Sequence, residues 1–296
     1  MRHRATAHPA EKARYGPGMD AFVLGGGGQL GSSEVGMLRA LLEAGVTPDL
    51  VIGTSVGAIN GAAVAALPTR EAVTRLSEMW QGLADSDIYS GSTLRRVRHL
   101  ARSRTAVHPN DPLRSMLEAQ FGDTRLEDLP VPFQCVAASI ERAAEHWFTS
   151  GPVVEAVLAS AAVPGILPPV QIGAEHFLDG GLVNSIPVGR AVALGARTIY
   201  VLQVGRIERP LSAPTRPWEV AMVAFEIARR HRFAGDMADL PDSVTVHVLP
   251  TGESDPPRYA DLSALRYRDF SRVQTRIDQA YEATAAYLRD RSARTG

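Results

Sequence analysis

Apolar residues occur both in short runs and at helical spacing along the chain, and residues 20–66 show the two patterns most clearly. The runs at 20–24 and 50–53 are short, continuous and followed by turn residues, which is typical of buried strands. Residues 32–44 carry apolar side chains on one face and stop at a glycine, and 56–66 predicts a second helix. This order of strand, helix, strand and helix predicts parallel strands joined by a right-handed crossover.

The same alternation continues to the end of the chain. Further strands are predicted at 133–139, 145–149, 176–178, 198–204 and 244–249, and further helices at 153–162, 186–194, 219–233 and 270–289. Residues 69–129 have a helical and turn-rich pattern. The run 218–233 is apolar on several faces, which favours core packing over a lipid-facing lid. We find no internal repeat and no Gly-, Ser- or Pro-rich linker, so the pattern favours one α/β domain over residues 19–296.

The first 18 residues are polar and lack the apolar central region of a secretory signal. We therefore expect residues 1–18 to form a disordered leader. No stretch of the chain reaches the ~18 consecutive apolar residues of a membrane span. These features predict a cytoplasmic protein, and peripheral contact with a membrane surface stays open.

Composition and charge exclude several kinds of chemistry. The chain has 296 residues, 45% hydrophobic and 21% charged, which is the balance of a globular protein with a sizeable core. A formal net charge of −1 gives no reason to expect nucleic acid as a partner. Cys135 is the single cysteine, which excludes an intramolecular disulfide and a cysteine-based zinc cluster. There is no calcium loop of the EF-hand type, and we expect no metal or cofactor.

A glycine-rich segment, Gly26-Gly27-Gly28-Gln29-Leu30-Gly31, connects the first predicted strand to the first helix. Glycines at such a turn leave backbone N–H groups free to bind negative charge, either a phosphate or the oxyanion of an acyl-transfer intermediate. The spacing also fits the G-x-G-x-x-G dinucleotide fingerprint. That interpretation requires an acidic residue at the end of the second strand, where this chain has Gly53-Thr54-Ser55. A nucleotide-binding oxidoreductase of the Rossmann type is therefore the weaker alternative.

The second glycine motif is Gly53-Thr54-Ser55-Val56-Gly57, where a predicted strand meets a predicted helix. A G-x-S-x-G turn in this context is typical of a nucleophile elbow, which exposes the serine hydroxyl beside a helix N-terminus. The alternative is a structural turn in which Ser55 caps the helix. We expect Ser55 to be a catalytic nucleophile.

A serine hydroxyl needs a base that removes its proton. The usual partner is a histidine on a late loop, but His231 lies in a predicted helix and His247 in a predicted strand. The third glycine motif, Asp179-Gly180-Gly181, is in isolation typical of a β-turn, and the need for a base makes Asp179 a candidate. Ser55 follows Gly28 by only 27 residues, a spacing that argues against an ordinary α/β-hydrolase. It places the glycine loop and the nucleophile on two neighbouring parallel strands.

Taken in order, the three motifs resemble those of the patatin-like phospholipases, a family of lipid acyl hydrolases. The resemblance covers about residues 20–205 and includes the segment 159–165 and Pro168-Pro169, which precede the aspartate. It implies a three-layer α/β/α fold with a mostly parallel sheet, and a Ser55–Asp179 dyad without histidine. It also implies an oxyanion loop at Gly26, Gly27 and Gly28, and it includes Gly31, Gly53, Gly57, Gly180 and Gly181 as motif glycines.

Two positions depart from the family pattern. Leu30 stands where family members commonly carry arginine, and Glu34 stands where a histidine is frequent. Loss of the arginine removes a cation close to the oxyanion loop. A catalytically weak lipid-binding relative is therefore a second alternative.

The resemblance implies a carboxylic ester hydrolase whose substrate is a lipid. Phospholipid, lysophospholipid and other acyl esters all fit, and the reaction would proceed through an acyl-enzyme intermediate. Asp179 would have to be partly desolvated against apolar walls in order to serve as the base. Acyl-chain specificity and oligomeric state stay open.

Overall fold

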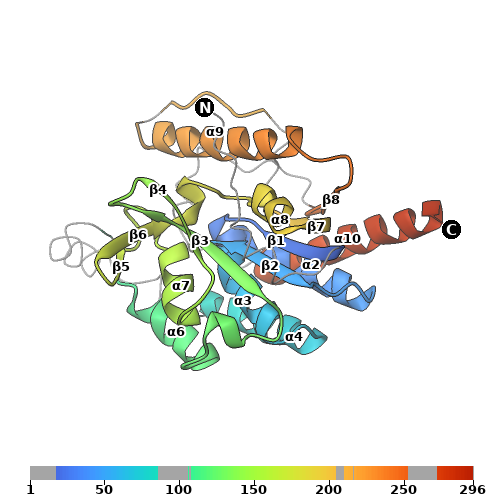
Figure 1. Cartoon of the computed structure of the whole chain (residues 1–296), viewed down its shortest axis with the longest axis horizontal. Helices are drawn as coiled ribbons and strands as arrows, with labels where there is room; N and C mark the ends of the chain where they lie inside the picture. Colours follow the sequence, from blue (N-terminus) through green and yellow to red (C-terminus); the bar gives the residue numbers. More distant parts are fainter. Residues whose placement is uncertain are drawn as a thin grey trace.

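A computed structural model describes residues 18–85, 106, 108–204, 210–215, 217–252 and 272–295, and Figure 1 shows one sheet with helices on both sides. Residues 1–17 lie outside this description, and with them all but the last residue of the predicted leader. Among the described residues, no helix combines the length and the apolar character that a membrane span requires.

The described strands form one eight-stranded sheet of mixed direction. They are β1 (Met19–Leu24), β2 (Leu50–Thr54), β3 (Phe133–Ser139), β4 (Ala144–Phe148), β5 (Val170–Ile172), β6 (Glu175–Asp179), β7 (Ala196–Leu202) and β8 (Thr245–Val248). Pairing follows the order β5-β6-β3-β2-β1-β7-β8, and β4 also pairs with β3. The β1–β2, β1–β7, β2–β3 and β7–β8 pairs are parallel, whereas β4, β5 and β6 pair antiparallel. The predicted parallel pairing of the first two strands is confirmed.

Helices cover both faces of the sheet and complete a three-layer α/β/α fold. Side chains of β1 alternate between two cores, with Phe22 and Leu24 under one face and Ala21 and Val23 under the other. The first core includes side chains from α2 (Ser32–Glu43), α3 (Val56–Ala66), α4 (Arg70–Asp85), α6 (Asp111–Phe121), α7 (Val153–Ser160) and α10 (Val273–Thr295). The second includes side chains from α8 (Val188–Leu194) and α9 (Pro217–Ala238), which lie together at the top of Figure 1.

The predicted strands agree with the structure to within two residues, whereas α9 and α10 end five and six residues later than predicted. Residues 86–105 and 107 of the predicted helical stretch 69–129 lie outside the described residues. Two further differences concern single elements. The sequence pattern does not predict β5, because three residues are too few to show a period. The expectation of core packing for 218–233 holds for Val223 and Phe233 but is wrong for Val220 and Ile227, which are 53% and 55% exposed. Part of the apolar surface of α9 therefore faces solvent.

The strands β2 and β6 end next to each other along one edge of β3. β4 pairs with residues 135–139 along one edge of β3, so the other partners must share the opposite edge. On that edge β2 ends at the pair Thr54–Val136, and β6, which runs the other way, ends at the pair Asp179–Ala137. The carboxyl ends of β2 and β6 therefore meet head to head at adjacent residues of β3.

Candidate active site

Ser55 lies at the turn between β2 and α3, and its backbone is strained. A φ of 56° and a ψ of −123° place it in a region that residues with a side chain rarely adopt. Such conformations cost about 1–3 kcal/mol each and cluster at functional sites. The strained turn is the geometry expected of a nucleophile elbow, in which the serine side chain stands clear of the strand and the helix.

The glycines on either side of Ser55 allow the strand and the helix to approach each other. A Cβ atom at Gly53 would lie 2.4 Å from the carbonyl oxygen of Gly57. A Cβ atom at Gly57 would lie 2.4 Å from the carbonyl oxygen of Leu24, at the end of β1. The packing of α3 against β1 and β2 therefore requires glycine at both positions of the G-x-S-x-G pattern.

Ser55 and Asp179 are hydrogen-bonded although 124 residues separate them in the sequence. Ser55 Oγ donates to Asp179 Oδ2 over 2.5 Å, and both residues are buried. Gly180 permits this approach, because a Cβ atom there would lie 2.1 Å from the carbonyl oxygen of Val136. The structure thus brings together the two residues that the sequence proposes as nucleophile and base.

The environment of Asp179 makes its carboxylate a stronger base. Burial raises the pKa of Asp179 to about 6, and hydrogen bonds from Ser55 and from the Gly181 N–H oppose this rise. Gly181 donates to Oδ1 over 2.7 Å, which leaves Oδ2 for Ser55. The carboxyl group is therefore desolvated and still ionised at neutral pH.

The glycine-rich loop lies against the nucleophile. A Cβ atom at Gly26 would lie 3.4 Å from Cβ of Ser55. The Gly26 N–H donates to the carbonyl oxygen of Ser185 over 2.9 Å, so this group holds the loop in place. For the N–H groups of Gly27 and Gly28, the described part of the chain provides no acceptor. These two N–H groups can therefore bind an oxyanion.

Close packing fixes the path of the loop. A Cβ atom at Gly27 would lie 1.7 Å from a methyl carbon of Val204, and one at Gly31 would lie 2.2 Å from a methyl carbon of Val56. Any larger residue at either position would push the loop away from β7 or from α3. Gly27 and Gly31 are thus explained by contact with their neighbours, whereas Gly28 has a φ of 57°, which favours glycine.

Ser160 is a site residue that sequence reasoning missed. It ends α7, it is fully buried, and its Oγ accepts the Ser55 N–H over 2.9 Å. The bond satisfies a buried donor on the strained residue and occupies the one N–H of Ser55. A signal was present, because Ser160 falls in the segment 159–165 that resembles the family pattern.

Glu34 belongs to a buried hydrogen-bonded group that supports the end of the loop. Asn60 Nδ2 donates to Glu34 Oε2 over 2.7 Å and to the carbonyl oxygen of Gly31 over 3.0 Å. Trp80 Nε1 donates to Asn60 Oδ1 over 3.1 Å. Burial raises the pKa of Glu34 well above its ordinary value, and the hydrogen bond from Asn60 opposes this rise.

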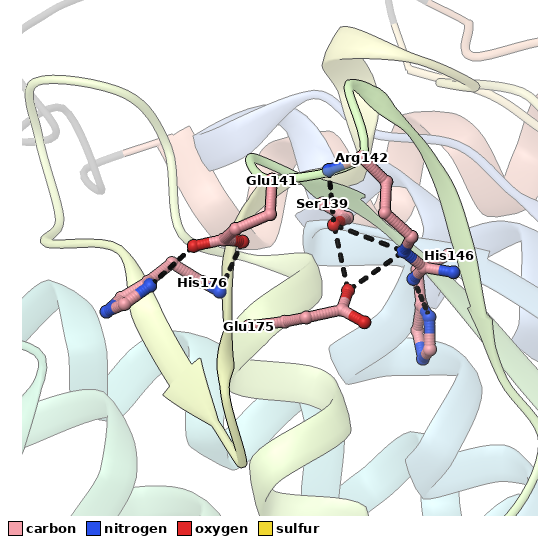
Figure 2. Close-up of polar contacts among 6 residues, drawn as sticks. All are labelled: Ser139, Glu141, Arg142, His146, Glu175 and His176. Carbon is pink, nitrogen blue, oxygen red and sulfur yellow. Dashed lines mark hydrogen bonds and ion pairs between the residues drawn. The ribbon is translucent and has the colours of Figure 1, made fainter.

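A polar cluster fastens β6 to the turn between β3 and β4 just before Asp179 (Figure 2). Glu141 accepts the backbone N–H of His176 over 2.8 Å and pairs with its Nδ1 over 2.7 Å. Glu175 accepts from Ser139 Oγ and from Arg142 Nε, each over 2.9 Å. Because Asp179 follows His176 by three residues, these contacts fix the register that places the base.

These observations define a class of protein, an α/β/α protein with a serine–carboxylate pair at a strand–helix elbow beside a glycine loop. The family model of the patatin-like phospholipases matches residues 22–192. The chain belongs to the patatin-like phospholipase family.

The chain is similar to part of two curated proteins that are much longer than the matched segment. Lysophospholipase nte1 of Aspergillus terreus is 32% identical over 195 residues, and patatin-like phospholipase domain-containing protein 7 of Mus musculus is 32% identical over 188 residues. The matches cover 63% and 62% of this chain but only 12% and 13% of those proteins, so the chain spans a small part of their length. Among solved structures, VipD from Legionella pneumophila matches with a TM-score of 0.47 and 16% identity, over 93% of this chain and 67% of that chain.

Replacing Ser160 by alanine is expected to lower the free energy of unfolding by about 1–3 kcal/mol, because the buried Ser55 N–H loses its acceptor. Ser32→Ala is the matched control, since the Ser32 hydroxyl is equally buried but has no hydrogen-bond partner among the described residues. Urea unfolding of both variants checks the difference. Equal stability of the two would contradict the role given to Ser160.

Asp179→Asn is expected to stabilise the fold above pH 6 and to lose this effect near pH 4. The pKa of Asp179 rises from 3.8 to about 6 on folding, so the unfolded chain releases its proton first. Stability of the wild type therefore falls as pH rises between these values and stays low above them. A shift of about two pKa units corresponds to about 3 kcal/mol at neutral pH. Urea unfolding at both pH values measures this, and a difference that does not depend on pH would contradict it.

Proposed function

We propose that the chain is a serine acyl hydrolase that cleaves lipid esters, with Ser55 as nucleophile and Asp179 as base. The observation that carries the proposal is the 2.5 Å hydrogen bond from a strained, buried serine to a buried carboxylate. Membership of the patatin-like phospholipase family supports it, as does the description of one relative as a lysophospholipase.

In the first step, Asp179 Oδ2 takes the proton of Ser55 Oγ while this oxygen attacks the ester carbonyl carbon. The tetrahedral intermediate collapses, the ester C–O bond breaks, and Asp179 returns the proton to the leaving alcohol or lysolipid. In the second step, Asp179 takes a proton from water, and the hydroxyl attacks the acyl-enzyme. The fatty acid leaves, and Ser55 regains its proton from Asp179.

Charge develops on the carbonyl oxygen in both steps, and the glycine loop supplies the donors for it. The proposal assigns this role to the N–H groups of Gly27 and Gly28, because the N–H of Gly26 is bonded to Ser185 and that of Ser55 to Ser160. One such donor contributes about 2.7–4 kcal/mol to the lowering of the barrier.

The proposed substrate class is a phospholipid, a lysophospholipid or another acyl ester. Leu182 supports peripheral contact with lipid, because this apolar residue follows Asp179 by three positions and is 42% exposed. We further propose that residues 19–296 act as a single domain. The cytoplasmic location stays a prediction.

Ser55→Ala is expected to abolish both ester turnover and covalent labelling by a fluorophosphonate, because the attacking oxygen is lost. A hydrolysis panel over acyl-chain lengths and headgroups measures turnover and identifies the substrate in the same experiment. Ser77→Ala, on α4, is the control and should label as the wild type does. Labelling or turnover that survives in Ser55→Ala would show that the nucleophile is another residue.

The pH dependence of kcat/KM is expected to follow the ionisation of Asp179. Its pKa of about 6 predicts a plateau above that pH and a tenfold fall per pH unit below it, as the base becomes protonated. Asp179→Asn should lose about 10²–10⁴-fold relative to the wild-type plateau and show no such slope. Circular dichroism at each pH confirms that the fold is intact, and a plateau that continues well below pH 6 would sink the assignment.

The lipid-binding relative without catalysis is the second candidate, and Leu30 is the observation that favours it. Rapid mixing with a chromogenic ester separates the two candidates. A burst of one alcohol per chain shows acylation of Ser55. Vesicle binding without any burst would establish the second candidate in place of the first.

A further inference from the structure

Arg229 lies on α9, outside the three glycine motifs and beyond the residues that the family model matches. It is buried, with 8% of its surface exposed. A buried charge is strongly destabilising unless partners compensate it, and arginine can engage several acceptors at once through its planar fork of N–H groups. The acceptors that Arg229 engages connect it to the proposed active site.

Three groups accept hydrogen bonds from the Arg229 guanidinium. Nε donates to Ser185 Oγ over 3.0 Å, and Nη2 donates to the carbonyl oxygen of Val204 over 3.0 Å. Nη1 pairs with Glu226, one turn earlier on α9, at 3.2 Å. One side chain thus joins α9 to the segment after β7 and to the segment after Gly180–Leu182.

Ser185 and Val204 support the beginning of the glycine loop. The carbonyl oxygen of Ser185 accepts the Gly26 N–H over 2.9 Å. Val204 packs so closely on Gly27 that a Cβ atom there would lie 1.7 Å from its methyl carbon. Arg229 therefore binds both supports, Ser185 at Gly26 and Val204 at Gly27.

We propose that Arg229 is a positioning residue that holds Ser185 and Val204 together and so aims the N–H groups of Gly27 and Gly28 at the oxyanion. The inference rests on the proposed acyl-hydrolase function and deepens it. Lysine cannot replace this arrangement, because an ammonium group has no planar fork that reaches two separate acceptors.

The positive charge of Arg229 also affects Glu34, in the helix that follows the loop. Burial raises the pKa of Glu34, and hydrogen bonds from Asn60 and Gly25 and the positive charge of Arg229 oppose that rise. Leu30 supplies no charge from the loop itself. A cation near the loop is thus provided by α9.

Arg229→Met, Arg229→Lys and Arg232→Met test this role. Arg232 is the matched control, because it lies on the same helix and pairs with Glu145 and Asp236, away from Ser185 and Val204 in the described contacts. Glu226 keeps its pair with Arg230 in every variant, so none of them leaves this carboxylate without a partner.

Amide hydrogen exchange of the peptide covering residues 25–31 gives a readout that does not require activity. The Gly26 amide is expected to exchange about tenfold faster or more in Arg229→Met, because the loop opens locally once its support moves. Arg232→Met is expected to exchange as the wild type does. Unchanged exchange in Arg229→Met overturns the proposal, whatever the ester assays show.

Kinetics on the fluorophosphonate-titrated active fraction separate positioning from misfolding. In Arg229→Met, kcat is expected to fall about 100-fold with KM nearly unchanged, since a misplacement of about 1 Å can cost this much. Arg229→Lys should lie between Arg229→Met and the wild type, and Arg232→Met should match the wild type. An equal loss in Arg232→Met, or a change confined to KM, overturns the positioning role. A wild type that hydrolyses no ester, together with faster exchange in Arg229→Met, refutes the proposed function and leaves the structural link standing.

Discussion

The site depends on one constraint, that two strands of opposite direction end on neighbouring residues of β3. β2 delivers Ser55 to this point, and β6 delivers Asp179 from the other side. A hydrogen bond of 2.5 Å between residues 124 positions apart needs both strands in register, because a slip of one residue turns the side chain to the opposite face. The cluster around Glu141 and Glu175 and the close fit of Gly180 against Val136 both act on that register.

Two unfavourable features are concentrated at this meeting point. The backbone of Ser55 is strained, at about 1–3 kcal/mol, and the buried carboxylate of Asp179 costs about 3 kcal/mol when it is ionised. Together they are a large part of the 5–15 kcal/mol or so by which a domain is stable. They persist because β2 and β3 are buried along their whole length. In addition, Ser160 accepts a hydrogen bond from the buried N–H of Ser55, and Gly181 donates one to the buried carboxylate of Asp179.

The sequence predicts those parts of the fold and site that are encoded locally. Hydrophobic periodicity and glycines at the ends of elements depend only on residues close in the sequence. For this reason β3 and α3 are predicted with the bounds that the structure has. Ser55 and Asp179 each lie in a glycine motif, so both can be proposed as site residues from the sequence before the contact between them is seen. Arg229 carries no local mark, because an arginine in an amphipathic helix is common. Ser160 lies in the segment 159–165 that resembles the family pattern, but the segment does not indicate what this serine contacts. Their roles arise only when distant segments come together, over 105 residues for Ser160 and Ser55.

The proposed active site is therefore made of motif residues and of residues that support them. The proposed nucleophile and base, Ser55 and Asp179, lie within residues 22–192, the part that the family model matches, whereas Val204 and Arg229 lie beyond it. Val204 and Arg229 can differ without any change in the glycine motifs. Val204 contacts the glycine loop through packing on Gly27, and Arg229 acts on it through Ser185. A departure such as Leu30 then has a different meaning. The loss of a cation from the loop is no argument against an oxyanion site when a buried arginine on another helix holds the residues on which the loop rests.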